Sequence, residues 1–216
     1  MVRITVVGGT GYAGSAIVTA AAARGHHVVS FSRNLPDDDA RVPGVRYKTG
    51  SILDSATRQS VTADTDVIVS ALSPRGELDG RIVEADRDLA DRAGQRGVRI
   101  GVVGGFSSLR VEKGGPRMAD GDGIPPEFAG EAKQMNTVLS ELMNSDNSVD
   151  WFFVSPAMQF GSYVPGEALG HYRVGGDVAF YDEAGVSAIS GADFARAIVD
   201  EIENPAHHRA HISIAY

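Results

Sequence analysis

The sequence contains no cysteine. Disulfide bonds, thiolate metal sites and thiol catalysis are therefore excluded. Patterns for other metals are weak as well. His207 and His211 have the spacing of a helical zinc pair, but Pro205 and the strand-like alternation after it argue against a helix there. The acidic segment at 120–123 lacks the glycine of a calcium loop, because Pro125 occupies that position. We predict no metal site.

Positive charge is also scarce. The 20 lysines and arginines are outnumbered by 28 acidic residues, which gives a net charge of −8 at pH 7. Nucleic-acid-binding proteins normally carry a basic face, so no nucleic-acid partner is expected. No apolar run approaches the roughly 18 residues of a membrane-spanning helix, and a strand pattern begins by residue 2, which leaves no room for a signal peptide. We expect a soluble, cytoplasmic protein with no membrane partner.

Strand-like and helix-like stretches alternate along the 216 residues, of which 43% are hydrophobic. This alternation is typical of α/β proteins with a parallel sheet. Strands are expected at 4–7, 27–32, 45–49, 66–71, 98–103, 150–155 and 208–215. Helices are expected at 13–23, 55–62, 79–96, 126–143 and 194–203. We predict one domain, residues 1–216, built as a Rossmann-type doubly wound parallel sheet with helices on both faces.

Residues 161–190 have a different character. Glycine turns there separate three short strand-like pieces, at 172–174, 178–181 and 186–189. We predict a small C-terminal β excursion on the substrate side of the sheet. The proline- and glycine-rich stretch 109–126 has little periodicity, which is typical of a binding loop or lid.

The N-terminal glycines carry the strongest chemical signal. A short buried strand at 4–7 runs into Gly-Gly-Thr-Gly-Tyr-Ala-Gly and then into an alanine-rich helix. The spacing fits the dinucleotide fingerprint, in which glycines allow a tight turn, a close approach of the backbone to a pyrophosphate, and close packing of helix on strand. A Walker loop is excluded because no Gly-Lys-Ser/Thr follows. We expect the pyrophosphate to be held at the helix N-terminus by Gly8, Thr10, Gly11, Tyr12, Ala13 and Gly14. The alternative is a glycine-rich turn without a ligand.

The residues after the strand at 27–32 determine whether a dinucleotide site prefers NAD or NADP. Enzymes specific for NAD place an acid there for the ribose 2′-hydroxyl, whereas an arginine accommodates a 2′-phosphate. Here Arg33 follows the strand and the first acid is Asp37, so NADP(H) is preferred, with NAD(H) as the alternative. The alternative is that Arg33 is an ordinary surface residue. Further cofactor contacts are expected from the carboxyl ends of the other strands, at Ser51, Ile52, Ala71, Leu72, Ser73, Gly104 and Pro156.

Three side chains are candidates for the reaction itself. Ser107, with Ser108 as its rival, follows the strand at 98–103 and could reach a substrate held against the nicotinamide. Lys133 lies one turn into the helix at 126–143, and His171 lies in the β excursion. Two of them have an ordinary structural alternative, namely a turn hydrogen bond for the serine and simple packing for the histidine.

These motifs together resemble the short-chain dehydrogenase/reductase superfamily in its atypical branch. More narrowly, the chain is similar to NAD(P)H-binding proteins named as candidate NADH-flavin reductases, which are related to biliverdin reductase B and to redox sensors of the nitrogen-metabolite-repression type. The resemblance covers nearly the whole length. Its marks are the segments 8–14, 101–105 with Ser107, 149–156, 170–173, 185–190, 192–195 and 202–205.

One departure from the superfamily bears on the reaction. Typical members use a Tyr-x-x-x-Lys pair in which the lysine lowers the pKa of the tyrosine. The corresponding region here reads Phe128-Ala-Gly-Glu-Ala-Lys133, with no tyrosine. The resemblance therefore implies an NADPH-dependent reductase whose acceptor is flat, such as a flavin or quinone bound as substrate rather than as a prosthetic group. Two alternatives stay open: a non-catalytic NADP(H)-binding redox sensor that acts through a protein partner, and an epimerase- or dehydratase-like activity. The sequence allows a monomer or a homodimer.

Overall fold

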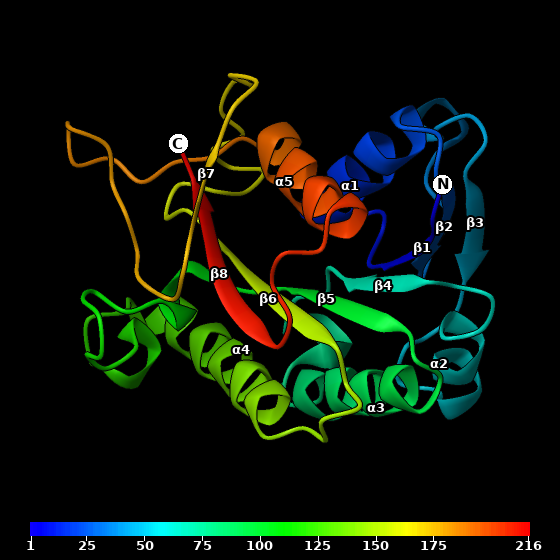
Figure 1. Ribbon diagram of the computed structural model, residues 1–216, viewed down its shortest axis with the longest axis horizontal. Helices are drawn as coiled ribbons and strands as arrows, with labels where there is room; N and C mark the ends of the chain where they lie inside the picture. Colours follow the sequence, from blue (N-terminus) through cyan, green and yellow to red (C-terminus); the bar gives the residue numbers. More distant parts are fainter.

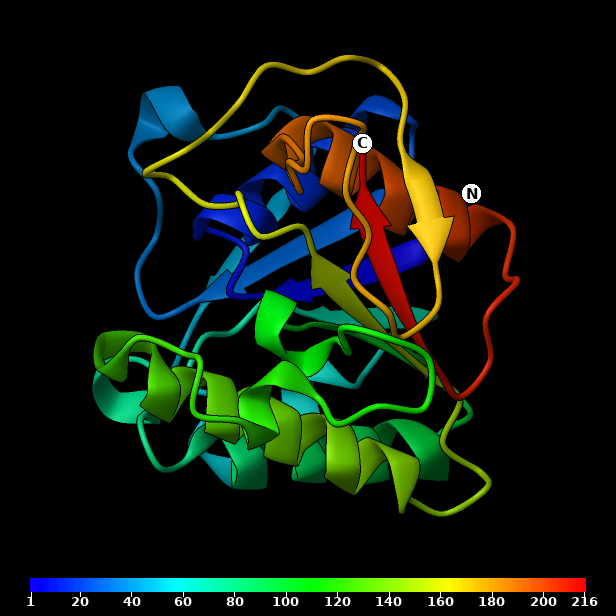
Figure 2. The same cartoon turned by 90° about the vertical axis from the view of Figure 1, so that its left-hand side faces the viewer.

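A computed structural model describes all residues from Met1 to Tyr216. Its centre is one eight-stranded sheet with the order β3-β2-β1-β4-β5-β6-β8-β7 (Figures 1 and 2). Seven of the strands run parallel, and β7 pairs antiparallel with β8 at the edge. The strands are β1 Arg3–Val7, β2 His27–Ser32, β3 Arg46–Thr49, β4 Val67–Ser70, β5 Arg99–Val103, β6 Trp151–Pro156, β7 Arg173–Gly175 and β8 Ala210–Ala215.

Helices cover both faces of the sheet. The α-helices are α1 Tyr12–Ala23, α2 Ser55–Val61, α3 Ile82–Gln95, α4 Pro126–Met143 and α5 Gly191–Glu203. Figure 1 shows α1 and α5 side by side on one face, with α2, α3 and α4 on the other. The predicted doubly wound Rossmann-type fold is therefore confirmed. No helix has both the length and the apolar character needed to cross a membrane.

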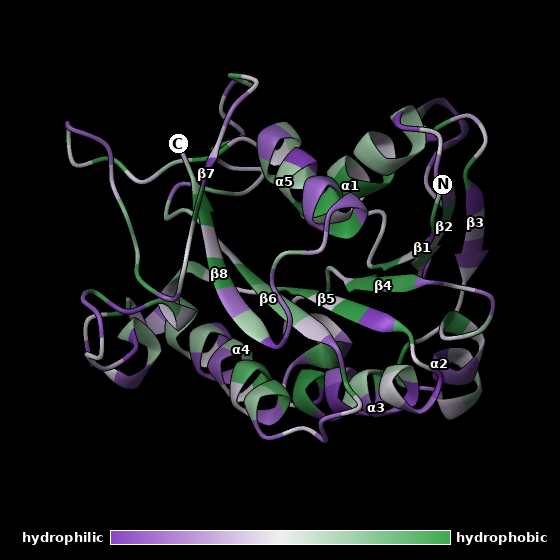
Figure 3. Ribbon diagram, viewed as in Figure 1, coloured by the Kyte–Doolittle hydropathy of each residue, from purple (hydrophilic) through white to green (hydrophobic).

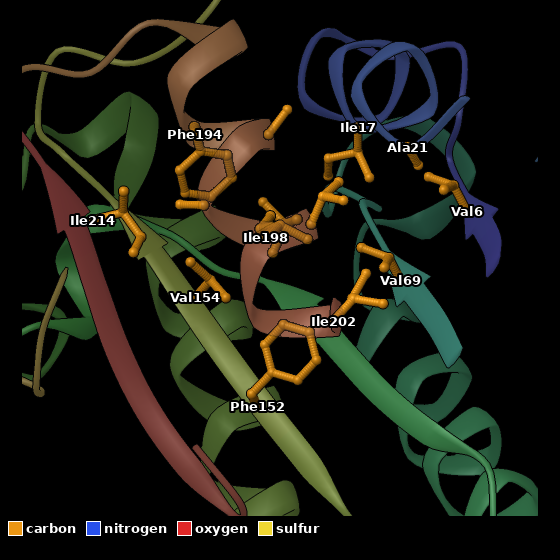
Figure 4. Close-up of a cluster of buried hydrophobic side chains, with 14 of the residues drawn as sticks. Val6, Ile17, Ala21, Val69, Phe152, Val154, Phe194, Ile198, Ile202 and Ile214 are labelled. Carbon is orange, nitrogen blue, oxygen red and sulfur yellow. The ribbon is translucent and has the colours of Figure 1, made fainter. Parts of the chain in front are cut away.

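Two hydrophobic cores follow from this layering, one on each face of the sheet. The central strands β4 and β6 are buried along their whole length, as parallel strands covered on both faces must be. The first core joins β1 and β6 to α1 and α5, and Figure 4 shows Val6, Ile17, Phe152, Phe194 and Ile198 within it. The second core joins the opposite face to α3 and α4. The strands between the helix layers are accordingly coloured mostly as hydrophobic in Figure 3.

The chain reverses its winding direction at β1. This strand pairs with β2 on one side and β4 on the other, so the connections from β1 and from β3 run to opposite sides of the sheet. In open parallel sheets such a switch point leaves a crevice beside the carboxyl ends of the strands, because the two flanking loops diverge there. The loops after β1, β2 and β4 meet at this crevice.

Some expected elements differ in the structure. Helix α3 begins at Ile82 rather than at 79, because the preceding residues form a 3-10 turn, Gly76–Leu78. Within the β excursion only β7 is a strand. The pieces predicted at 178–181 and 186–189 make just one isolated bridge each, Val178 with Arg110 and Ala188 with Gln159. Their residues favour strands, but the backbone beside them is loop. No regular ladder of hydrogen bonds therefore forms beyond the single bridge.

The stretch 109–126 is fixed at its beginning. Arg110 bridges Arg117, and the Ala179 N–H donates to the Arg110 carbonyl at 2.9 Å. A 3-10 turn, Met118–Asp120, follows. The first half of this predicted loop is therefore held to the β excursion by backbone hydrogen bonds.

Candidate functional site

A cleft of about 240 Å³ lies at the switch point, at the carboxyl ends of β1, β2 and β4. It contains eight of the predicted cofactor residues: Gly8, Thr10, Gly11, Arg33, Ile52, Ala71, Leu72 and Ser73. Its remaining lining residues are Val7, Phe31, Ser32, Asn34, Gly50, Arg75, Glu77 and Leu78. A second hollow, of about 290 Å³, lies at the amino ends of β1 and β2 and contains none of the predicted residues.

The glycine turn after β1 is built from contacts that exclude larger residues. Gly8 has a φ of +80°, and a Cβ there would lie 2.7 Å from the Ala71 carbonyl oxygen. Its N–H donates to the Phe31 carbonyl at 2.8 Å, which ties the turn to β2. A Cβ on Gly14 would lie 2.1 Å from the Gly8 carbonyl oxygen, so α1 can pack on the turn only through glycine.

Gly11 is different. Its backbone is extended, with φ −77° and ψ 173°, which any residue adopts. The nearest atom to a Cβ there would be the Gly8 carbonyl oxygen at 3.4 Å, the edge of ordinary van der Waals contact. Packing therefore does not require glycine at this position. Gly11 lines the cleft, where it adds no side chain.

The start of α1 supplies hydrogen-bond donors beside Gly11. The first helical hydrogen bond is donated by the Ser15 N–H to the Gly11 carbonyl at 2.8 Å. The N–H groups of Tyr12, Ala13 and Gly14 consequently have no acceptor within the helix. Unpaired N–H groups at the positive end of a helix are the donors that a pyrophosphate requires. The residues present thus fit a dinucleotide.

The Tyr12 side chain has a separate role. Its hydroxyl donates to the Pro165 carbonyl at 3.1 Å and accepts from the Gly191 N–H at 3.1 Å. Its ring packs edge-on against Phe160, with 5.2 Å between centroids. Of the predicted pyrophosphate contacts at Tyr12, only the backbone N–H lies free, and the side chain joins the glycine turn to the loop before β7 and to the first residue of α5.

The rim of the cleft beyond β2 carries two arginines, each paired with a glutamate. The Arg33 side chain is 65% exposed and lies 3.8 Å from Glu77. Asn34 and Arg75 line the same rim. Arg75 donates to both carboxylate oxygens of Glu131 on α4, at 2.6 and 3.0 Å, and this pairing raises the pKa of Arg75. Sequence reasoning missed Arg75 because it lies in the connection from β4 to α3, and only the order of the strands brings that connection beside Arg33.

The walls of the cleft are apolar. Phe31, Ile52, Ala71 and Leu72 all line it, as a site for an adenine ring and its ribose requires. Ser51, predicted for the same place, does not line the cleft. Its Oγ accepts from the Leu53 N–H at 3.3 Å, which is the local turn bond expected of a serine before a helix.

The residues predicted at the nicotinamide end lie outside the cleft. A Cβ on Gly104 would lie 2.0 Å from the Phe153 ring, so packing alone accounts for that glycine. Pro156 is buried at the end of β6, opposite Ile214 of β8. Ser107 is half-buried in the 3-10 turn Phe106–Ser108, whereas its rival Ser108 is 1% exposed and its hydroxyl has no partner. Of the two serines, Ser107 is the accessible one.

The other two catalytic candidates are separate from the cleft. Lys133 is exposed on α4 and has no ion-pair partner. It lies on the solvent face of the helix, whereas Glu131 and Gln134 face the loop after β4. His171 is exposed beyond α5, where its Nδ1 lies 3.3 Å from the Leu169 carbonyl oxygen and its ring lies near Tyr216. The structure does not bring either residue together with the glycine turn.

The switch-point cleft, the glycine turn and the open helix N-terminus define a Rossmann-type dinucleotide-binding protein. Comparison with known families agrees: residues 8–205 match the NAD(P)H-binding family. The chain belongs to this family, and it is an atypical member of the short-chain dehydrogenase/reductase superfamily.

Solved structures of similar proteins cover the whole chain. A candidate exported protein from Burkholderia pseudomallei is 35% identical, covers 100% of both chains and has a TM-score of 0.86. A candidate epimerase from Bacteroides thetaiotaomicron is 29% identical over 100% of this chain and 98% of its own, with a TM-score of 0.87. A candidate NADH-flavin reductase from Streptococcus pneumoniae TIGR4 is 28% identical over 100% and 99%, with a TM-score of 0.82. Because one of these relatives is described as exported, the cytoplasmic location stays a prediction.

Proposed function

We propose that the protein is an NAD(P)H-dependent oxidoreductase that prefers NADPH and passes a hydride to a flat acceptor such as a flavin or quinone. The observation that carries the proposal is Gly11. The fold does not need glycine there, yet Gly11 lines the cleft and directly precedes the free N–H groups of α1. A dinucleotide pyrophosphate is the ligand that explains a glycine at this position.

The preference for NADPH rests on the rim of the cleft. Arg33 follows β2 directly, where an NAD-specific site would carry an acid, and Arg75 adds a second guanidinium on the same rim. Glu77 lies 3.8 Å from Arg33 and already neutralises part of its charge. A bound 2′-phosphate would compete with Glu77 for Arg33, and a guanidinium binds phosphate through two parallel hydrogen bonds.

The flat acceptor is inferred from what the chain lacks. Without the Tyr-x-x-x-Lys pair there is no tyrosine to exchange a proton with an alcohol or ketone. When bound, NADPH supplies a hydride; with one proton from solvent this reduces a flavin or quinone by two electrons and leaves NADP⁺. The chain's part is to bind, orient and exclude water, and Ser107 is the side chain proposed to contact the nicotinamide or the acceptor. The similarity to the Streptococcus pneumoniae protein supports this choice of acceptor.

Two measurements test the proposal. Titration with NADPH and with NADH, followed by nicotinamide fluorescence, is expected to give at least tenfold tighter binding of NADPH, and Arg33→Ala should remove most of the difference. Steady-state oxidation of NADPH is then measured with FMN, FAD and several quinones. Turnover with one of them is the expected result. Equal affinity for both nucleotides would show that Arg33 does not bind the 2′-phosphate. If the protein binds neither nucleotide, the proposal is overturned.

Two rival functions are separated by the same data. Tight NADPH binding with no turnover across the panel would favour the redox sensor, which would then bind a protein partner differently with and without NADPH. The epimerase alternative is supported by the similarity to the Bacteroides thetaiotaomicron protein. It predicts nucleotide that copurifies with the protein and is not consumed.

A further inference from the structure

A chain of buried hydrogen bonds lies beneath the turn that follows β5. His211 of β8 forms its centre. Its Nε2 lies 2.8 Å from the Ser155 Oγ of β6, and its Nδ1 lies 3.0 Å from the Arg117 Nη1. The Ser155 Oγ in turn lies 2.8 Å from the carbonyl oxygen of Gly105. Ser155 is fully buried and Arg117 is 7% exposed.

The direction of every bond in this chain follows from the arginine. A guanidinium only donates, so the Nδ1 of His211 must accept from Arg117 and the ring proton must be on Nε2. Nε2–H therefore donates to the Ser155 Oγ, and the serine hydroxyl donates to the Gly105 carbonyl. This arrangement requires a neutral imidazole. Burial, reinforced by the nearby Arg117 charge, lowers the pKa of His211 to about 3 and so keeps the ring neutral.

The Ser155–His211 pair is therefore not a nucleophile with its general base. A general base must accept the hydroxyl proton, but Nε2 of His211 already carries a hydrogen and Ser155 directs its own toward Gly105. Neither atom is free to react. The pair instead holds the Gly105 carbonyl in place.

The same chain holds both ends of one short turn. Gly105 accepts from Ser155 and also from the Ser108 N–H at 3.2 Å, which closes the 3-10 turn Phe106–Ser108. At the other end, the Arg117 Nη1 donates to the Ser108 carbonyl at 2.7 Å. Ser107 lies between these two fixed carbonyls. Beyond Arg117, Arg110 donates to Asp177 at 2.7 Å, which joins the chain to the β excursion.

We propose that Ser155, His211 and Arg117 are positioning residues that fix Ser107 for hydride transfer. None of the three lines the cleft, and they act through the backbone of the Gly105–Ser108 turn. The inference rests on the proposed reductase function for its catalytic consequence. Its structural part, the immobilisation of the turn, does not depend on that function. Small displacements of a positioned group slow a reaction by up to about 100-fold while leaving remote binding intact.

The test compares two serines that are removed in the same way. Ser155→Ala breaks the hydrogen-bond chain between His211 and Gly105. Ser213→Ala is the matched control, because Ser213 is 2% exposed, lies on the neighbouring strand and donates to the Val178 carbonyl at 3.2 Å without contacting Gly105. Ser155→Ala is expected to bind NADPH within twofold of wild type and to lose at least tenfold in kcat. Ser213→Ala should match wild type in both. His211→Leu breaks the chain at a second point and is expected to behave like Ser155→Ala.

Amide hydrogen exchange tests the structural part without cofactor. Exchange at residues 106–109 is expected to be at least tenfold faster in Ser155→Ala than in wild type, and unchanged in Ser213→Ala. Equal exchange in all three proteins would overturn the positioning role, even where NADPH oxidation stands. A similar loss of kcat in both alanine variants would also overturn it, since removing any buried hydroxyl would then be enough. If wild type neither binds NADPH nor turns over, the proposed function fails, and the exchange rates still decide whether the chain fixes the turn.

Discussion

At the scale of single residues, the glycines between β1 and α1 differ in what surrounds them. Gly8 needs a positive φ, and a Cβ on Gly9 would lie 2.4 Å from the Ser30 Oγ. Gly14 is required by the close approach of α1 to the turn. Only Gly11 has neither a strained backbone nor a close neighbour. Three of the glycines therefore build the turn, and the fourth leaves space for a ligand.

This difference predicts opposite behaviour for two alanine variants. Gly11→Ala should change the free energy of unfolding by less than about 1 kcal/mol, because alanine restricts the unfolded chain but caps α1 less well than glycine does. Its affinity for NADPH should fall at least tenfold. Gly14→Ala should lower the free energy of unfolding by about 1–3 kcal/mol, since its Cβ overlaps the Gly8 carbonyl. Urea unfolding and nicotinamide fluorescence measure the two effects. Wild-type NADPH affinity in Gly11→Ala would contradict the assignment of that space to the cofactor.

At the scale of elements, the N-termini of α1 and α5 are joined through one side chain. Tyr12 comes directly after the glycine turn, and its hydroxyl bonds both the Pro165 carbonyl and the Gly191 N–H. Asp193 holds the same loop from the other side by accepting from the N–H groups of Leu169 and Gly170, at 2.7 and 3.2 Å. The loop before β7 is therefore attached to the glycine turn as well as to α5.

Tyr12→Phe is expected to loosen this attachment. The variant keeps the ring contact with Phe160 but leaves the buried Gly191 N–H without its acceptor, at a loss of about 1–2 kcal/mol in the free energy of unfolding. Limited proteolysis should cleave within residues 161–170 faster than in wild type. Tyr163→Phe is the control, because Tyr163 is 77% exposed and its hydroxyl has no protein partner. Equal cleavage in the two variants would show that the Tyr12 hydroxyl does not hold the loop.

At the scale of the whole molecule, the interior contains three buried carboxylates. Asp193 and Glu201 are compensated: burial acts to raise the pKa of each, but hydrogen bonds outweigh it and lower both values. For Glu201 the main partner is Arg99 at 2.6 Å. Asp86 on α3 has only the hydroxyl of Ser70, at 2.6 Å, and its second oxygen has no partner. Burial therefore raises the pKa of Asp86 to about 6.

The contribution of Asp86 to stability is expected to fall as the pH rises from 3.8 to about 6. The pKa of Asp86 is higher in the folded than in the unfolded protein, so its contribution is complete below pH 3.8 and is lost as the folded carboxyl ionises. The difference between the two pKa values corresponds to about 3 kcal/mol at pH 8. Asp86→Asn should remove this dependence, so its free energy of unfolding relative to wild type should rise between pH 4 and pH 8. Asp91→Asn, at an exposed position on the same helix, should show no such rise. Parallel pH profiles for wild type and Asp86→Asn would contradict the prediction.

The fold class and the glycine turn could be predicted from the sequence alone. Both depend on local information: the alternation of buried strands with amphipathic helices, and glycines spaced so closely that the chain can only turn sharply into α1. The sequence also indicated Ser107, with Ser108 as its rival, and of the two only the Ser107 side chain is accessible. The strands predicted at 178–181 and 186–189 were wrong, because a strand also needs a neighbouring strand to pair with.

The contacts between residues far apart in the sequence could not be predicted, because they depend on how the elements pack. Arg75 lines the rim with Arg33 because β1 lies between β2 and β4 in the sheet, and no local pattern records that order. The pairing of β6 with β8 likewise brings Ser155 to His211, which lie 56 residues apart. Lys133 and His171 carry reactive groups, but the faces of α4 and of the β excursion turn them toward solvent. Residue type and spacing fix the local backbone, whereas the direction of a side chain and its partners depend on how the elements pack together.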